Sequence, residues 1–70
     1  MVKKVKAVIA LLEKNGWVYA RTKGDHIIYR KEGEPRPIPI PGKLNDDLAI
    51  GTLRSILRQA KLGLSDFEED

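Results

Sequence analysis

A strict alternation of proline and isoleucine over residues 37–41 constrains the fold of this chain more than any other feature. Successive side chains of a β-strand point to opposite faces of a sheet, so Ile38 and Ile40 share one face. Proline has no backbone N–H to donate to a neighbouring strand, which confines such a strand to the edge of a sheet. The alternation therefore predicts an edge strand that buries its isoleucines.

Two stretches have the apolar periodicity of amphipathic helices. Apolar residues recur at helical spacing over residues 2–12 and 53–60, with charged residues on the other face of each stretch. Asn15-Gly16 should end the first helix and Gly63 the second, because these residue types tolerate the left-handed conformation that closes a helix.

Two further runs, residues 17–22 and 26–31, are rich in aromatic and β-branched residues and predict strands joined by a short hairpin at 23–25. Residues 42–50 should form a polar loop. The predicted fold class is α+β in two layers, ordered helix-strand-strand-strand-helix. Two helices would cover one face of a three-stranded antiparallel sheet and leave the other face open.

The first predicted strand carries two pairs of candidate core residues. Trp17 and Tyr19 fall on one face, and Val18 and Ala20 on the other. We expect at least one of these pairs to pack in the core, with stacking on nucleic-acid bases as the alternative.

The composition excludes several classes of function. Seventy residues allow a single domain, residues 1–70, around one core. There is no cysteine and only one histidine, which excludes disulfides, cysteine nucleophiles and cysteine zinc sites; we expect neither a metal nor a cofactor. The longest apolar run, Ala7–Leu12, is too short to cross a bilayer, and we identify no targeting segment. A cytoplasmic protein without a membrane partner is therefore expected.

The charge is unevenly distributed along the chain. Residues 1–43 hold ten basic and four acidic side chains, a balance of +6, and residues 44–65 add +1, whereas residues 66–70 contribute −4 to the total of +3. Ser65 is positioned to cap this acidic end as a last helical turn. The cationic remainder favours a polyanionic partner such as nucleic acid.

Three motifs follow one another along the chain: Gly16-Trp17 at the start of the first strand, Lys23–His26 followed by Ile28–Arg30, and Gly51–Ala60. Together they resemble the HicA family of small bacterial and archaeal toxins, from the first helix to about Leu64. The resemblance implies the fold of a double-stranded RNA-binding domain, endoribonuclease activity on mRNA (an mRNA interferase), and neutralisation by a HicB-type antitoxin. It also implies that His26 is the catalytic residue.

Some positions depart from the family pattern. Asp25 replaces a frequent serine and places a carboxylate next to His26, and Pro41 stands where many members have another histidine. The loop at residues 42–50 is slightly longer than usual. Lys61 occupies the glycine position of the Ala-Gly-Leu sequence that commonly closes the last helix. None of these departures removes the implied catalytic residue, but they leave the substrate preference open.

The residues themselves limit the chemistry. Cleavage of RNA without a metal needs a base for the 2′-hydroxyl proton, an acid for the leaving 5′-oxygen, and cations that stabilise the phosphorane. Imidazole can give or take a proton near neutral pH, and the missing side chain of Gly24 lets a backbone approach closely. Because His26 is the only histidine, the second proton role falls to Lys23, Tyr29, water or a substrate group.

Basic residues near the predicted hairpin and first helix are candidate phosphate contacts. With the hairpin glycine, the candidate RNA-binding residues are Lys3, Lys4, Lys6, Arg21, Lys23, Gly24, Arg30 and Lys31. Three more cations lie at helical spacing on the second helix and could face either RNA or the antitoxin: Arg54, Arg58 and Lys61.

Two other classes of function remain open at this point. The same basic face could belong to a non-catalytic RNA- or DNA-binding module. A protein-interaction module could instead use the acidic end and the proline-rich strand.

Overall fold

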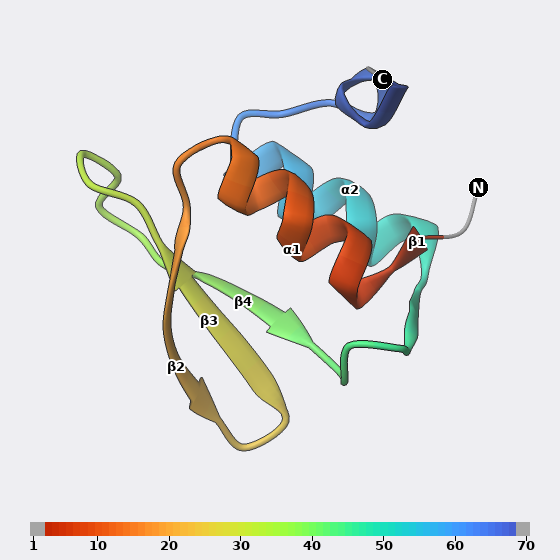
Figure 1. Ribbon diagram of the computed structural model, residues 1–70, viewed down its shortest axis with the longest axis horizontal. Helices are drawn as coiled ribbons and strands as arrows, with labels where there is room; N and C mark the ends of the chain where they lie inside the picture. The colour runs from red at the N-terminus through yellow and green to blue at the C-terminus, as the bar shows by residue number, and fades with distance from the viewer. Residues whose placement is uncertain (1–2, 69–70) are drawn as a thin grey trace.

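The structure is a computed structural model that describes residues 3–68 (Figure 1). The predicted α+β class and element order are confirmed: two helices accompany a three-stranded antiparallel sheet. Val2, Glu69 and Asp70, which belong to the predicted first helix and acidic end, lie outside the described residues. The helices are α1 (Val5–Lys14) and α2 (Ile50–Gln59), and the sheet strands are β2 (Val18–Lys23), β3 (His26–Arg30) and β4 (Ile38–Pro41).

The strand β4 forms one edge of the sheet, as the proline alternation predicts, and β3 lies at its centre. Ile38 pairs with Tyr29 and Ile40 pairs with Ile27, so these four side chains share one face. Ile38 and Ile40 are buried, whereas Pro39 between them is exposed. The alternation therefore directs the isoleucines into the core and the prolines outward.

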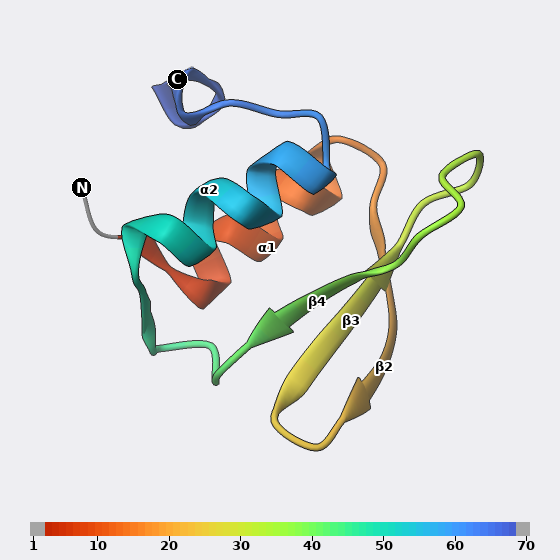
Figure 2. The same ribbon diagram turned by 180° about the vertical axis from the view of Figure 1, so that it is seen from behind.

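Both helices contribute to a single core on this inner face, and α2 contacts β4 (Figure 2). Burial of these apolar side chains supplies the main stabilisation of so small a fold. The opposite face of the sheet stays open, as predicted. The fully buried side chains of the two helices include Val5, Val8, Leu12, Leu53, Ile56 and Leu57.

The aromatic residues at the start of β2 behave differently from the prediction. Trp17 is 2% exposed, but Tyr19 on the same predicted face is 55% exposed, and Val18 is 60% exposed. The backbone N–H of Trp17 donates to the carbonyl of Leu12, so this residue belongs to the turn after α1, and β2 begins only at Val18. The expectation that one pair packs together in the core is therefore wrong.

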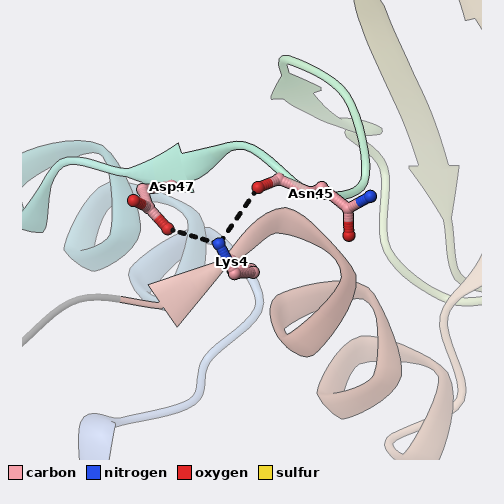
Figure 3. A network of polar contacts seen from close by, with 3 residues as sticks. All are labelled: Lys4, Asn45 and Asp47. Carbon is pink, nitrogen blue, oxygen red and sulfur yellow. Dashed lines mark hydrogen bonds and ion pairs between the residues drawn. The ribbon is translucent and has the colours of Figure 1, made fainter.

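The N-terminus of α1 is held by a small second sheet that the sequence analysis missed. Lys3–Lys4 form strand β1, which pairs with β5 (Asp47–Leu48) inside the predicted polar loop 42–50. Lys3 and Lys4 therefore precede α1, whereas the sequence pattern placed them within the helix. The Lys4 Nζ lies 3.1 Å from Asp47 Oδ1 and donates to the Asn45 carbonyl at 3.2 Å (Figure 3).

This second sheet has a physical cause. No side chain caps α1, and the first N–H groups of a helix need partners. The N–H of Val5 donates to the Asp46 carbonyl at 2.9 Å, and that of Lys6 donates to the Leu44 carbonyl at 3.0 Å. Backbone carbonyls of the loop therefore perform the capping that a side chain usually performs.

The C-terminus of α2 also differs from the prediction. The helix ends at Gln59, and Lys61, not Gly63, adopts the left-handed conformation, with φ of 63°. The Leu62 N–H donates to the Leu57 carbonyl at 2.8 Å, which closes the helix. A 3-10 helix, η1 (Leu64–Glu68), follows.

The predicted cap of the acidic end is wrong as well. The 3-10 helix η1 begins at Leu64, so Ser65 lies inside it and does not precede it. The Gly63 N–H, just before η1, donates to the Asp66 carboxylate at 2.7 Å. Leu64 and Phe67 pack against the core. In both views η1 lies at the end of the molecule opposite the β2–β3 hairpin (Figures 1 and 2).

Candidate active site

The open face of the sheet carries the single histidine. Since Ile27 and Tyr29 of β3 pack on the core, His26 and Ile28 point to the other face. The cross-strand register places Lys23 of β2 and Pro41 of β4 on either side of His26. A shallow groove of about 690 Å³ on this face is lined by Arg21, Lys23, Gly24, His26, Ile28, Pro37 and Pro39.

A two-residue turn positions His26 at the mouth of the hairpin. Lys23 and His26 are the last paired residues, and Gly24 between them has φ of 62°, which a residue with a side chain rarely adopts. The Gly42 N–H donates to the Asp25 carbonyl at 3.0 Å and links this turn to the end of β4. The turn is therefore held by the pairing of β2 with β3 and by a hydrogen bond to the end of β4.

Asp25 contacts the imidazole directly. The His26 Nδ1 lies 2.9 Å from Asp25 Oδ1, and the two side chains are 45% and 84% exposed. An ionised carboxylate can only accept a hydrogen bond, so Nδ1 carries the proton of this contact. In the neutral imidazole, Nε2 is then the unprotonated nitrogen and is available as a base.

Tyr29, one of the candidates for the second proton role, faces away from His26. Its hydroxyl donates to the Glu13 carboxylate of α1 at 2.8 Å on the inner face of the sheet. Burial, followed by this hydrogen bond, raises the pKa of Tyr29 to about 12. Tyr29 remains protonated at neutral pH, but its hydroxyl lies on the inner face of the sheet and is therefore not a partner of His26. Lys23, water and a substrate group remain.

The structure brings only part of the predicted cations together. Arg21 and Lys23 line the groove with His26 and Gly24, and Arg30 is exposed further along the outer face, where it pairs with Val18. The Lys31 side chain instead lies over the backbone of Gly16. A Cβ added to Gly16 would lie 3.2 Å from the Cε of Lys31.

The lysines before and within α1 lie on other elements than the groove. Lys3 Nζ sits 4.6 Å from the ring centroid of Phe67, a cation–π contact, and Lys4 pairs with Asp47. Lys6 is exposed on α1. These three predicted RNA contacts are therefore not part of the groove around His26.

The cations of α2 and of the turn that follows it form a separate group on the helical side of the sheet. Arg54 and Arg58 are exposed, and Lys61 Nζ lies 3.3 Å from Glu34 Oε2. Since the helices cover the inner face, these side chains do not share a surface with His26.

The apolar half of the groove was not predicted from the sequence, where the prolines indicated an edge strand or a contact to another protein. The register places Ile28 opposite Pro39 on the outer face. The signal was present in the sequence, because isoleucines that point inward leave the alternating prolines to point outward.

Within residues 3–68, no group of three or more His, Cys, Asp or Glu side chains is arranged to hold a metal ion. None of the helices described is long and apolar enough to cross a membrane.

Comparison with known proteins identifies one family. The model of the family described as HicA toxin of bacterial toxin-antitoxin matches residues 5–62 of the 70. That range includes both helices, the three-stranded sheet and the groove. No curated protein matches the chain significantly.

Proposed function

The chain belongs to the HicA toxin family of toxin–antitoxin systems, and we propose that it is a metal-independent endoribonuclease that cleaves mRNA with His26. The observation that carries this proposal is the position of His26 in the groove, between the cations of β2 and the apolar side of β4. A polyanion that follows the cations would bring its phosphates to the imidazole. Because the proposed substrate is mRNA, we expect the protein to act in the cytoplasm.

The proposed reaction is attack of a 2′-hydroxyl on the adjacent phosphorus. Nε2 of His26 takes the 2′-hydroxyl proton as the new O–P bond forms. The bond from phosphorus to the 5′-oxygen then breaks, and the leaving oxygen receives a proton from Lys23, water or a substrate group. The products are a 2′,3′-cyclic phosphate and a 5′-hydroxyl, and no metal is required to balance this step.

Arg21 and Lys23 have an electrostatic role in this proposal. Both are exposed, and both line the groove that holds His26. Their charges would stabilise the negative charge that develops on the phosphorane. Asp25 would hold the imidazole with Nε2 available.

We assign neutralisation to a HicB-type antitoxin that covers the groove and so shields His26. Arg54, Arg58 and Lys61 lie on the helical side of the sheet, away from His26, so RNA in the groove would not contact them. We assign them to a second part of the antitoxin, separate from the part that covers the groove. A stable complex would also raise the apparent stability of a small fold through mass action.

One observation favours a second candidate, a non-catalytic RNA- or DNA-binding module. The groove presents a single imidazole, without a second histidine to act as its acid. A binding module needs only the cations and the apolar side of the same groove.

The test compares the purified protein with His26→Ala on a long RNA in the presence of a chelator. We expect cleavage by the wild type and none by the variant, with equal folding by circular dichroism. Equal cleavage by both proteins would refute the role of His26. Equal binding by both proteins without cleavage would favour the binding module.

A further inference from the structure

The open face of the sheet is divided into two chemical halves. Arg21 and Lys23 stand on β2, two residues apart and therefore on the same face, at a spacing of about 6.6 Å along the strand. The β4 side carries Pro37 and Pro39, with Ile28 of the central strand next to them. His26 lies at the end of the central strand, between the halves.

The side chains of the apolar half are exposed or partly exposed and are not part of the core. Pro37 and Pro39 are exposed and Ile28 is partly exposed, while the inward residues of the same strands complete the core without them. A cationic strand beside an apolar floor matches a ligand that has anionic groups along one edge and flat, poorly hydrated groups along the other. A single strand of nucleic acid has this arrangement.

We propose that this face is a platform for a short single-stranded segment of RNA, with phosphates along β2 and riboses or bases on Ile28 and the prolines. The inference rests on the proposed function, because it takes RNA as the ligand of the His26 groove. A duplex stacks its bases inside the helix and offers mainly its backbone to a protein. An apolar floor would contribute nothing to duplex binding, whereas an unpaired nucleotide can place a base or ribose on it.

The division of the face also determines which part of the bound RNA reaches His26. A segment with its phosphates over Arg21 and Lys23 continues directly to His26, which pairs with Lys23 across the strands. The platform would then select unpaired regions as sites of cleavage.

The test measures binding to an RNA whose 2′-hydroxyls are replaced by fluorine, which removes the nucleophile and keeps the phosphates and bases. Fluorescence anisotropy compares the single strand with the duplex of the same sequence. Ile28→Thr shortens the apolar floor and keeps a β-branched residue in the strand. Ile50→Thr makes the same change at an isoleucine that is 40% exposed at the start of α2, away from the groove.

We expect the wild type to bind the single strand more tightly than the duplex. Ile28→Thr should weaken single-strand binding about fivefold, as expected for the loss of buried apolar surface, and Ile50→Thr should leave it unchanged. Pro39→Thr provides a second variant in case Ile28→Thr unfolds, with the same expected direction.

Tighter binding of the duplex, or equal effects of Ile28→Thr and Ile50→Thr, would overturn the platform. So would a result in which Ile28→Thr weakens only a complex with the antitoxin, since the floor would then serve a protein. Absence of cleavage of ordinary RNA by the wild type, with the binding pattern intact, would overturn the proposed ribonuclease and leave the platform standing.

Discussion

The contact between Asp25 and His26 predicts a graded loss of activity when the carboxylate is removed. The contact is 2.9 Å long, but both side chains are substantially exposed, so water competes for each of them. A hydrogen bond of this kind contributes about 0.5 to 1.5 kcal/mol. If that energy orients the imidazole in the transition state, Asp25→Ala should slow cleavage by about two- to tenfold.

The variants separate orientation from charge. Asp25→Asn keeps an oxygen that can accept from Nδ1, so its rate should lie nearer to that of the wild type than the rate of Asp25→Ala. The assay is single-turnover cleavage of RNA, with nitrogen NMR of His26 to identify which ring nitrogen carries the proton. The stability of all three proteins should agree to within about 0.5 to 1.5 kcal/mol, the contribution of this one hydrogen bond, because the contact lies at an exposed turn.

Two results would refute this reasoning. A loss in Asp25→Ala as large as that in His26→Ala would mean that the carboxylate itself takes part in the chemistry. An unchanged rate together with an unchanged protonation pattern in the NMR spectrum would mean that Asp25 does not position the ring.

Further predictions concern the core contact, the end of α2 and the groove. The pKa of Tyr29 is raised from 10.0 to about 12. Its contribution to the free energy of unfolding is therefore complete below pH 10.0, and about 2 kcal/mol should be lost as the pH rises towards 12. Urea denaturation at increasing pH should show this fall in stability, and Tyr29→Phe should remove it. Lys61→Gly should be about 0.5 to 1 kcal/mol more stable than Lys61→Ala in the same assay, since both variants lose the ion pair and only glycine relieves the positive φ; equal stability would contradict a strained Lys61. The affinity for single-stranded RNA should fall with salt, and Arg21→Gln should reduce the slope of log K against log salt by about 0.7, whereas Arg36→Gln, outside the groove, should leave it unchanged.

Much of the fold follows from local sequence patterns. The helical spacing around Val8 and Leu57 and the alternation through Ile38 and Ile40 each report which side chains are buried, and the structure buries all of these. The missing N–H of Pro39 further restricts β4 to an edge. These patterns suffice for the α+β class and the element order because each is repeated over a whole element.

The parts that could not be predicted depend on contacts between distant residues. The β1–β5 pair contains two residues from each strand, which is too short for a periodic signal. The carbonyls that cap α1 come from Leu44 and Asp46, and no local rule connects them to Val5. The end of α2 was misplaced because a glycine usually supplies the left-handed residue, whereas here Leu62 packs on the core and Lys61 is held in that conformation.

The candidate site was predicted in part for the same reason. The resemblance implied His26, and Arg21 and Lys23, which the structure places beside it, were two of the candidate RNA contacts. Lys3 and Lys4 were included because charge alone does not show which surface a lysine shares. The apolar half of the groove, around Ile28 and Pro39, appears only when the register of β3 and β4 is known.

The chemical ends of the RNA products test the central claim most directly. Wild-type protein in a chelator should leave a 2′,3′-cyclic phosphate on one product and a 5′-hydroxyl on the other, because the account makes the 2′-hydroxyl the nucleophile and the Nε2 of His26 its base. His26→Ala at equal concentration and with verified folding should yield neither product. A 3′-hydroxyl with a 5′-phosphate, or unchanged cleavage by His26→Ala, would contradict the account.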